Sequence, residues 1–148
     1  MMSTAPITID ELLETFEDLQ AWDERYGFLI ELGNELSPMP PELQNDSTKV
    51  DGCMSQVWMV ADVRPSDNGA AGEGLMEITA DSDSIIVKGL IAVLLALFNG
   101  QTPGEVIDRD PEQVFEKLGL KQHLSGQRRN GLYAMVQRIK TLAKLNAS

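Results

Sequence analysis

The stretch from Ile85 to Phe98 limits the folds open to this chain more than any other segment. It holds one charged residue, Lys88, and is apolar around almost the whole circumference of a helix. A helix of that kind has to be buried, so this stretch predicts a central core helix. It is too short to span a bilayer. We expect Ser82 or Asp83 to cap a helix over residues 84–98, and Asn99 with Gly100 to end it.

Two amphipathic helices are predicted before that core segment. Apolar residues recur at helical spacing over residues 9–19, with Thr8 as the N-cap and Glu11 as its capping-box partner. A second helix starts near Trp22 and ends before a group of prolines, which cannot continue a helix interior. Gly33 in this helix has no side chain, so a neighbouring element could pack closely against it.

The middle of the chain has the residue types of β-strands. Strand-forming residues dominate positions 56–63, and residues 75–79 predict the next strand of a hairpin. The tip of the hairpin would be residues 64–74, which are rich in Gly, Pro, Asp and Asn. A short strand at Lys49–Val50 would be the third of an antiparallel sheet.

Helix signals return towards the C-terminus. Thr102–Pro103 and Asp110–Pro111 each have the pattern of an N-cap followed by proline at the first helical position. Ser125 can cap a last helix with an apolar stripe from Leu132 to Ala143. The order of elements predicts a single α+β domain over residues 1–148, with a core of about residues 9–145. Its two layers would be a three-stranded antiparallel sheet and the helices that pack against it.

The acidic charge balance excludes several classes of partner. The formal net charge is −11 and the pI is about 4.4, so nucleic acids and anionic membranes are poor partners. A basic protein surface would be attracted instead. The N-terminal residues have neither the apolar region of a signal peptide nor the arginine-rich character of a transit peptide. We expect a cytoplasmic protein that is a monomer or a weak dimer.

Cys53 is the one cysteine of the chain, and it stands between Gly52 and a strand-like run. Together with the one histidine, His123, it falls short of a zinc site or an iron–sulfur cluster site, so no metal is expected. Cys53 is therefore predicted to act alone, as a nucleophile or a covalent carrier. A buried, inert thiol is the other interpretation. Asp51 would disfavour the thiolate, and His123 could reach Cys53 only through the fold, which leaves a Cys–His hydrolase or transferase open.

Four stretches, in order and at matching spacing, resemble one known family: Trp22–Gly33, Val50–Trp58, Asp81–Leu90 and Gln122–Leu132. The family is SufE, the sulfur acceptors of iron–sulfur cluster assembly, with its paralogue CsdE. The resemblance covers about residues 9–142, and it implies the α+β fold that SufE shares with the IscU-type scaffolds. The glycine-rich loop at residues 64–74 is longer than the family pattern, and its role is open.

The resemblance also implies a function. A pyridoxal-phosphate cysteine desulfurase, SufS-like or CsdA-like, would pass persulfide sulfur to Cys53 and be stimulated by the chain. The chain would deliver that sulfur to a SufBCD-type scaffold complex, without a cofactor and without free turnover of its own. A carrier with a second thiol would form a disulfide and release its cargo, so a lone cysteine suits this work.

The residues that would support the cysteine loop or bind a partner fall into two groups. Asp51, Gly52 and Gln56 flank Cys53, whereas the more distant candidates are Asp81, Asp83, Arg128 and His123. In particular, Arg128 matches a family arginine that packs near the cysteine loop. An IscU-like cluster holder is excluded by the cysteine count unless a dimer shares the cluster. A Cys–His hydrolase and a purely regulatory desulfurase-binding module remain as alternatives.

Overall fold

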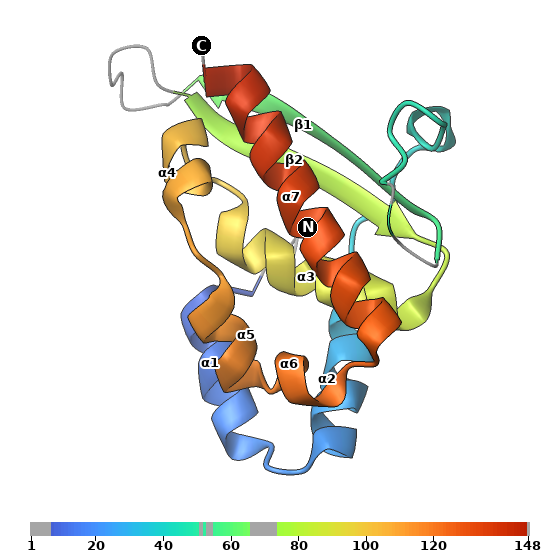
Figure 1. Cartoon of the computed structure of the whole chain (residues 1–148), viewed down its shortest axis with the longest axis vertical. Helices are drawn as coiled ribbons and strands as arrows, with labels where there is room; N and C mark the ends of the chain where they lie inside the picture. The colour runs from blue at the N-terminus through green and yellow to red at the C-terminus, as the bar shows by residue number, and fades with distance from the viewer. Residues whose placement is uncertain (1–6, 51, 53–54, 66–73, 148) are drawn as a thin grey trace, which may run out of the picture.

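The structure is a computed structural model that describes residues 7–50, 52, 55–65 and 74–147 of the 148-residue chain. Helices and a hairpin form two layers (Figure 1). In chain order the elements are α1 (Ile9–Asp18), α2 (Trp22–Asn34), the 3₁₀ turn η1 (Pro41–Leu43), β1 (Val57–Pro65), β2 (Gly74–Ser82), α3 (Ile85–Phe98), α4 (Pro103–Asp108), α5 (Glu112–Leu118), α6 (Leu120–His123) and α7 (Gly126–Ala147).

The sheet in the described part of the chain has two antiparallel strands, and the expected three-stranded sheet is corrected accordingly. β1 and β2 pair along their whole length, from Val57 opposite Ser82 to Pro65 opposite Gly74. Where the third strand was expected, one isolated bridge joins Lys49 to Trp58. Two backbone hydrogen bonds flank that bridge, Val50 N to Val57 O and Met59 N to Thr48 O, both 2.8 Å long. The hairpin itself is confirmed, and the centre of its tip, residues 66–73, lies outside the described residues.

The apolar helix α3 lies at the centre of the core, as its composition predicts. Its neighbours are α2, β2, α1 and α7, and Figure 1 shows α7 crossing in front of both the hairpin and α3. Buried residues from all these elements join α3 in one hydrophobic cluster. In the described part of the chain, no helix has both the length and the hydropathy needed to cross a membrane.

The crossing of α2 and α3 depends on two glycines. A Cβ atom on Gly33 would lie 2.7 Å from the backbone nitrogen of Gly89, and one on Gly89 would lie 2.2 Å from the carbonyl oxygen of Leu29. Since real Cβ atoms do not approach backbone atoms so closely, only glycine fits at both positions. The close approach expected at Gly33 is confirmed, and the two backbones meet without side chains between them.

Most of the predicted helix caps are confirmed. Thr8 and Thr102 accept hydrogen bonds from the third residue of α1 and α4, and Ser125 Oγ accepts from Arg128 N at the start of α7. One prediction is wrong by one or two residues: Ser84 caps α3, because β2 extends through Ser82. At the start of α5, Asp110 Oδ1 accepts from Glu112 N at 3.1 Å, and Pro111 between them has helical dihedral angles, so the predicted Asp110–Pro111 helix start is confirmed.

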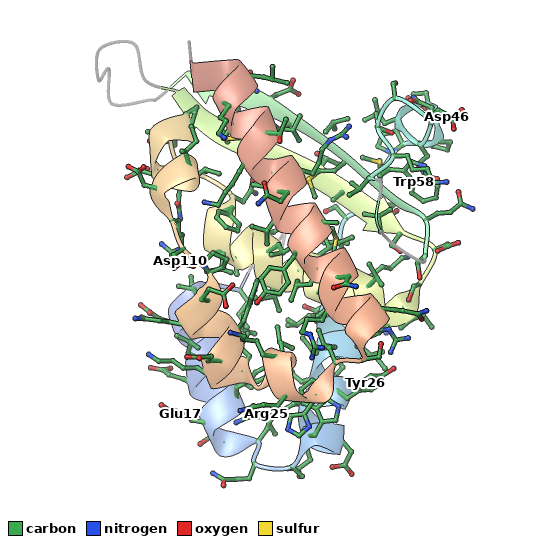
Figure 2. All side chains as sticks on the ribbon, in the orientation of Figure 1. Glu17, Arg25, Tyr26, Asp46, Trp58 and Asp110 are labelled. Carbon is green, nitrogen blue, oxygen red and sulfur yellow. The ribbon has the colours of Figure 1, made fainter. Side chains whose placement is uncertain are left out.

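Arg25 joins α1 and α2 to the end of α5 within this fold. It is labelled in Figure 2 where α1 and α2 meet. Its guanidinium donates to the carbonyl oxygens of Phe16 at 2.8 Å and Leu118 at 3.2 Å, while Nε donates to that of Leu19 at 2.6 Å. Carbonyl groups at helix ends lack partners within the helix, so one arginine here satisfies the ends of both α1 and α5. This contact attaches the C-terminal helices to the N-terminal pair.

Candidate functional site

The cysteine loop lies between the bridge at Lys49 and the start of β1. Cys53 and Asp51, both predicted as site residues, are outside the described residues, as is Met54. Gly52 is exposed and has a φ of 93°, a left-handed conformation that favours glycine. A Cβ atom at this position would lie 3.2 Å from the Cβ of Ala134 on α7. The residue before Cys53 therefore lies against the face of α7.

A pair of hydrogen bonds ties the far side of the loop to the turn between β2 and α3. Gln56 N donates to Asp83 Oδ1 at 3.1 Å, and Asp83 N donates to Gln56 O at 3.2 Å. Both residues are exposed, so water competes for these bonds and each contributes only modestly to stability. We call this pair the Gln56–Asp83 clasp. It brings together two of the predicted site residues.

A hollow of about 350 Å³ opens beside the loop, between α3 and α7. Its lining combines an apolar floor with polar side chains and one cation: Ser55, Val87, Leu90, Ser125, Gln127, Arg128, Gly131 and Met135. Ser55 belongs to the loop itself and is two residues from Cys53. We call this the loop hollow. Its volume lies in the range of small-molecule and cofactor pockets.

The first turn of α7 positions the cation of the loop hollow. Ser125 caps the helix, and two arginines follow within its first turn, where the helix dipole disfavours positive charge. Arg129 turns back and donates to the carbonyl oxygen of Lys121 at 2.8 Å, in α6. Arg128 lines the hollow. At this helix end, Arg129 therefore has a structural contact, and Arg128 places a positive charge at the candidate site.

Asp81 is buried, and its contacts hold two segments of the fold together. Its carboxylate accepts from Met39 N at 3.3 Å and from Ser82 N at 2.8 Å, and it lies 3.7 Å from Lys88 Nζ. These contacts hold the segment after α2 against the end of β2. Asp81 therefore lies within the scaffold behind the Gln56–Asp83 clasp, and it does not line the loop hollow.

His123 faces a different part of the molecule. Its ring stacks on that of Trp22, with the centroids 4.7 Å apart and the planes at 9°. The contact joins the end of α6 to the start of α2. Among the contacts of the described residues, none connects His123 with Gly52, Ser55 or Gln56.

Apart from Met135, the residues that line the loop hollow fall within the four stretches that carry the family resemblance, but among them only Arg128 was predicted as a site residue. Ser55 and Gln127 were given no role of their own, and Ser125 was predicted only as a helix cap. Val87 and Leu90 are three residues apart on α3 and so share one face, but on a helix that is apolar all round the pattern does not identify that face. Within the described ranges, no group of three or more metal-ligating side chains is close enough to hold an ion.

Comparisons with known proteins identify the family of this chain. A family model described as SufE, an Fe-S metabolism associated domain, matches residues 10–143. An uncharacterised SufE-like protein of Rhizobium meliloti is 40% identical over 137 residues, covering 93% of this chain and 95% of that protein. A second, from Rhizobium etli, is 38% identical over 141 residues, covering 95% and 93%.

The fold has a counterpart among solved structures. The solution structure of a hypothetical protein from Thermus thermophilus superposes with a TM-score of 0.69. It is 20% identical in sequence, and the match covers 95% of this chain and 96% of that one, so it supports the α+β fold alone. The family model and the two relatives together span nearly the whole chain, and the chain belongs to the SufE family of proteins associated with iron–sulfur metabolism.

Proposed function

We propose that this protein carries sulfane sulfur on Cys53. It would take the sulfur from the persulfide of a pyridoxal-phosphate cysteine desulfurase, stimulate that enzyme, and deliver the sulfur to an iron–sulfur cluster scaffold. Family membership supports a role in sulfur transfer for iron–sulfur metabolism. The observation that carries the finer proposal is the loop hollow, a recess with an apolar floor whose lining includes Ser55 of the cysteine loop and the cationic Arg128 of α7.

Transfer of sulfur to this protein requires one thiol and no external oxidant or reductant. The Cys53 thiolate attacks the outer sulfur of the donor persulfide, so a new S–S bond forms on Cys53 while the donor S–S bond breaks. The donor cysteine leaves as a thiolate and takes up the proton that Cys53 gave up. The number of persulfides is unchanged, and no electrons leave the pair of proteins. With no second cysteine in the chain, no internal thiol can attack the new persulfide.

The loop hollow would protect the sulfane sulfur on Cys53 after it leaves the desulfurase and before it reaches the scaffold. Sulfane sulfur exposed to oxidants is lost by oxidation, so a carrier gains from a recess into which the loaded side chain can retract. A persulfide is acidic and would be anionic near neutral pH, and the Arg128 guanidinium supplies the matching charge. The weak Gln56–Asp83 clasp would release the loop when a desulfurase docks, because two exposed hydrogen bonds cost little to break.

The test is intact-mass analysis of the protein after incubation with cysteine and a desulfurase, SufS-like in one arm and CsdA-like in another. Each sulfur accepted should add about 32 Da, the mass of one sulfur atom, at Cys53. The Cys53→Ser variant should fold normally and gain no mass. A wild-type protein that gains no mass with either enzyme would contradict the proposed carrier role.

The same assay separates the two alternatives. A purely regulatory module would stimulate the desulfurase equally well as the Cys53→Ser variant, without any gain in mass. For a Cys–His hydrolase, His123→Ala would abolish activity. We expect His123→Ala to leave sulfur transfer unchanged, since His123 stacks on Trp22 rather than contacting the described residues around the loop. Delivery is tested by loss of the added mass on mixing with a SufBCD-type scaffold complex.

A further inference from the structure

A second hollow, of about 510 Å³, lies on the other side of α3. It runs between the end of α2, the end of α3 and the middle of β2, and its floor is aliphatic: Leu32, Leu36, Ile78, Ala92, Leu95 and Ala96. We call it the α2–α3 groove. Ala92, Leu95 and Ala96 are only half-buried there, although they belong to the most apolar helix of the chain. An open stretch of such a helix leaves an apolar surface that another chain could cover.

The two hollows are separate. Val87 and Leu90 of α3 line the loop hollow, whereas Ala92, Leu95 and Ala96 line the α2–α3 groove. Successive helical residues are rotated by about 100°, which places these two sets on nearly opposite faces of α3. Of the described residues, none lines both hollows. A molecule seated in the α2–α3 groove would therefore leave the cysteine loop accessible.

The charges around the α2–α3 groove favour a positively charged ligand. Glu35 and Glu77 line it, and none of its described lining residues is a lysine or an arginine. The C-terminal ends of both α2 and α3 open into it, and neither helix has a basic residue in its last turn. Each helix end contributes a partial negative charge, so carboxylates and dipoles act in the same direction. Arg64 pairs with Glu77 at 2.9 Å from an exposed position on β1, whereas no ion pair within the described ranges involves Glu35.

We propose that the α2–α3 groove is a docking site for a segment of a partner protein that presents a lysine or arginine beside aliphatic side chains. The aliphatic side chains would cover Ala92, Leu95 and Ala96, and the cation would lie near Glu35 and the two helix ends. The chain's net charge of −11 would attract such a segment from a distance. The proposal does not involve Cys53 or its loop, so it stands independently of the proposed function.

The experiment is selection of a random twelve-residue peptide library on the full-length protein, followed by fluorescence-anisotropy titration of the enriched peptides. We expect the enriched peptides to combine aliphatic residues with lysine or arginine. Ala96→Trp fills the groove and should weaken their binding at least about tenfold, because it removes the central apolar contact. Ala21→Trp is the matched control, since Ala21 is exposed at the other end of α2, and binding to it should be unchanged.

A charge variant keeps the test valid if Ala96→Trp perturbs the helix. Glu35→Lys changes an exposed side chain, so the protein should stay folded. It should weaken binding about fivefold at low salt, the effect of losing one surface ion pair, and the difference should shrink as salt is added.

Four results would overturn the proposal. The first is enrichment of acidic or uncharged peptides. The second is a peptide affinity that neither Ala96→Trp nor Glu35→Lys changes. The third is binding at least about tenfold tighter to a chain lacking residues 1–6, which would show that the chain's own N-terminal residues, next to the groove residue Ile7, fill the site. The fourth is a wild-type dimer that Ala96→Trp converts to a monomer, which would assign the groove to a second copy.

Discussion

The α2–α3 crossing and the surroundings of the cysteine loop are built in opposite ways, although both contact α3. At the crossing, the backbones at Gly33 and Gly89 meet with no space for a Cβ atom. Beside the loop there is a recess of about 350 Å³ lined by both apolar and polar side chains, and two exposed hydrogen bonds hold the turn next to it. Close packing gives rigidity, whereas exposed polar contacts open at low cost. Stability and sulfur transfer should therefore respond to different substitutions.

The largest effect is expected from breaking the crossing with Gly89→Val. A Cβ at this position would lie 2.2 Å from the Leu29 carbonyl oxygen, so α2 and α3 would have to move apart. We expect the free energy of unfolding to fall by more than about 3 kcal/mol, measured by urea denaturation. Gly104→Val is the control, because a Cβ there meets no atom within 4 Å, and it should change stability by less than about 1 kcal/mol. Equal stability of the two variants would show that the crossing is not close-packed.

A smaller effect, on function alone, is expected from Arg128→Gln in the loop hollow. The variant removes the cation facing the recess but leaves the Ser125 cap in place, so stability should stay within about 0.5 kcal/mol of the wild type. Sulfur transfer to Cys53 should slow about tenfold, the loss expected for one charge-assisted hydrogen bond to the persulfide. The rate of mass gain measures this. Arg64→Gln, at an exposed position on the hairpin, should transfer normally. If both variants transfer sulfur equally, Arg128 has no part in the reaction.

The smallest effect is expected from Asp83→Ala, which removes one of the two bonds of the Gln56–Asp83 clasp. The lost bond, from Gln56 N to Asp83 Oδ1, is exposed and worth about 1 kcal/mol, so the loop should open about fivefold more often. Alkylation of Cys53 by iodoacetamide should accelerate by that factor. Asp62→Ala is the control, since Asp62 is a β1 residue away from the clasp. An unchanged alkylation rate would mean that the clasp does not restrain the loop.

The elements that could be predicted from sequence are those with local chemical signals. Thr8, Thr102 and Ser125 mark helix starts because a hydroxyl can accept from a backbone N–H in the first turn. The start of α3 was misplaced because Ser82 belongs to β2, where it lies opposite Val57. The length of β2 is decided by its pairing with β1, a separate segment of the sequence, and local sequence does not show how far that pairing extends. The expected third strand is not confirmed: in the described residues it is reduced to the Lys49–Trp58 bridge.

The candidate site could be predicted in part. Its chemical centre, Cys53, follows from the composition and from the resemblance to the SufE family, and it remains a prediction because it lies outside the described residues. The position of Arg128 in the lining of the loop hollow agrees with the resemblance. Asp81 and Asp83 are two residues apart, yet one is buried against Met39 and the other is exposed in the clasp. Sequence spacing alone does not separate these environments, because they depend on which segments fold back against the turn.

The first turn of α7 has a consequence for the design of variants. Buried residues such as Leu132 and Met135 fix how this helix is rotated against the core, and consecutive residues at its start diverge by about 100°. For that reason Arg128 is directed to the recess while Arg129 binds α6. Inserting or deleting a single residue between Arg129 and Leu132 would rotate both arginines away from these positions without altering the charge. The order of residues in one helical turn, more than the presence of two arginines, decides which guanidinium lines the recess.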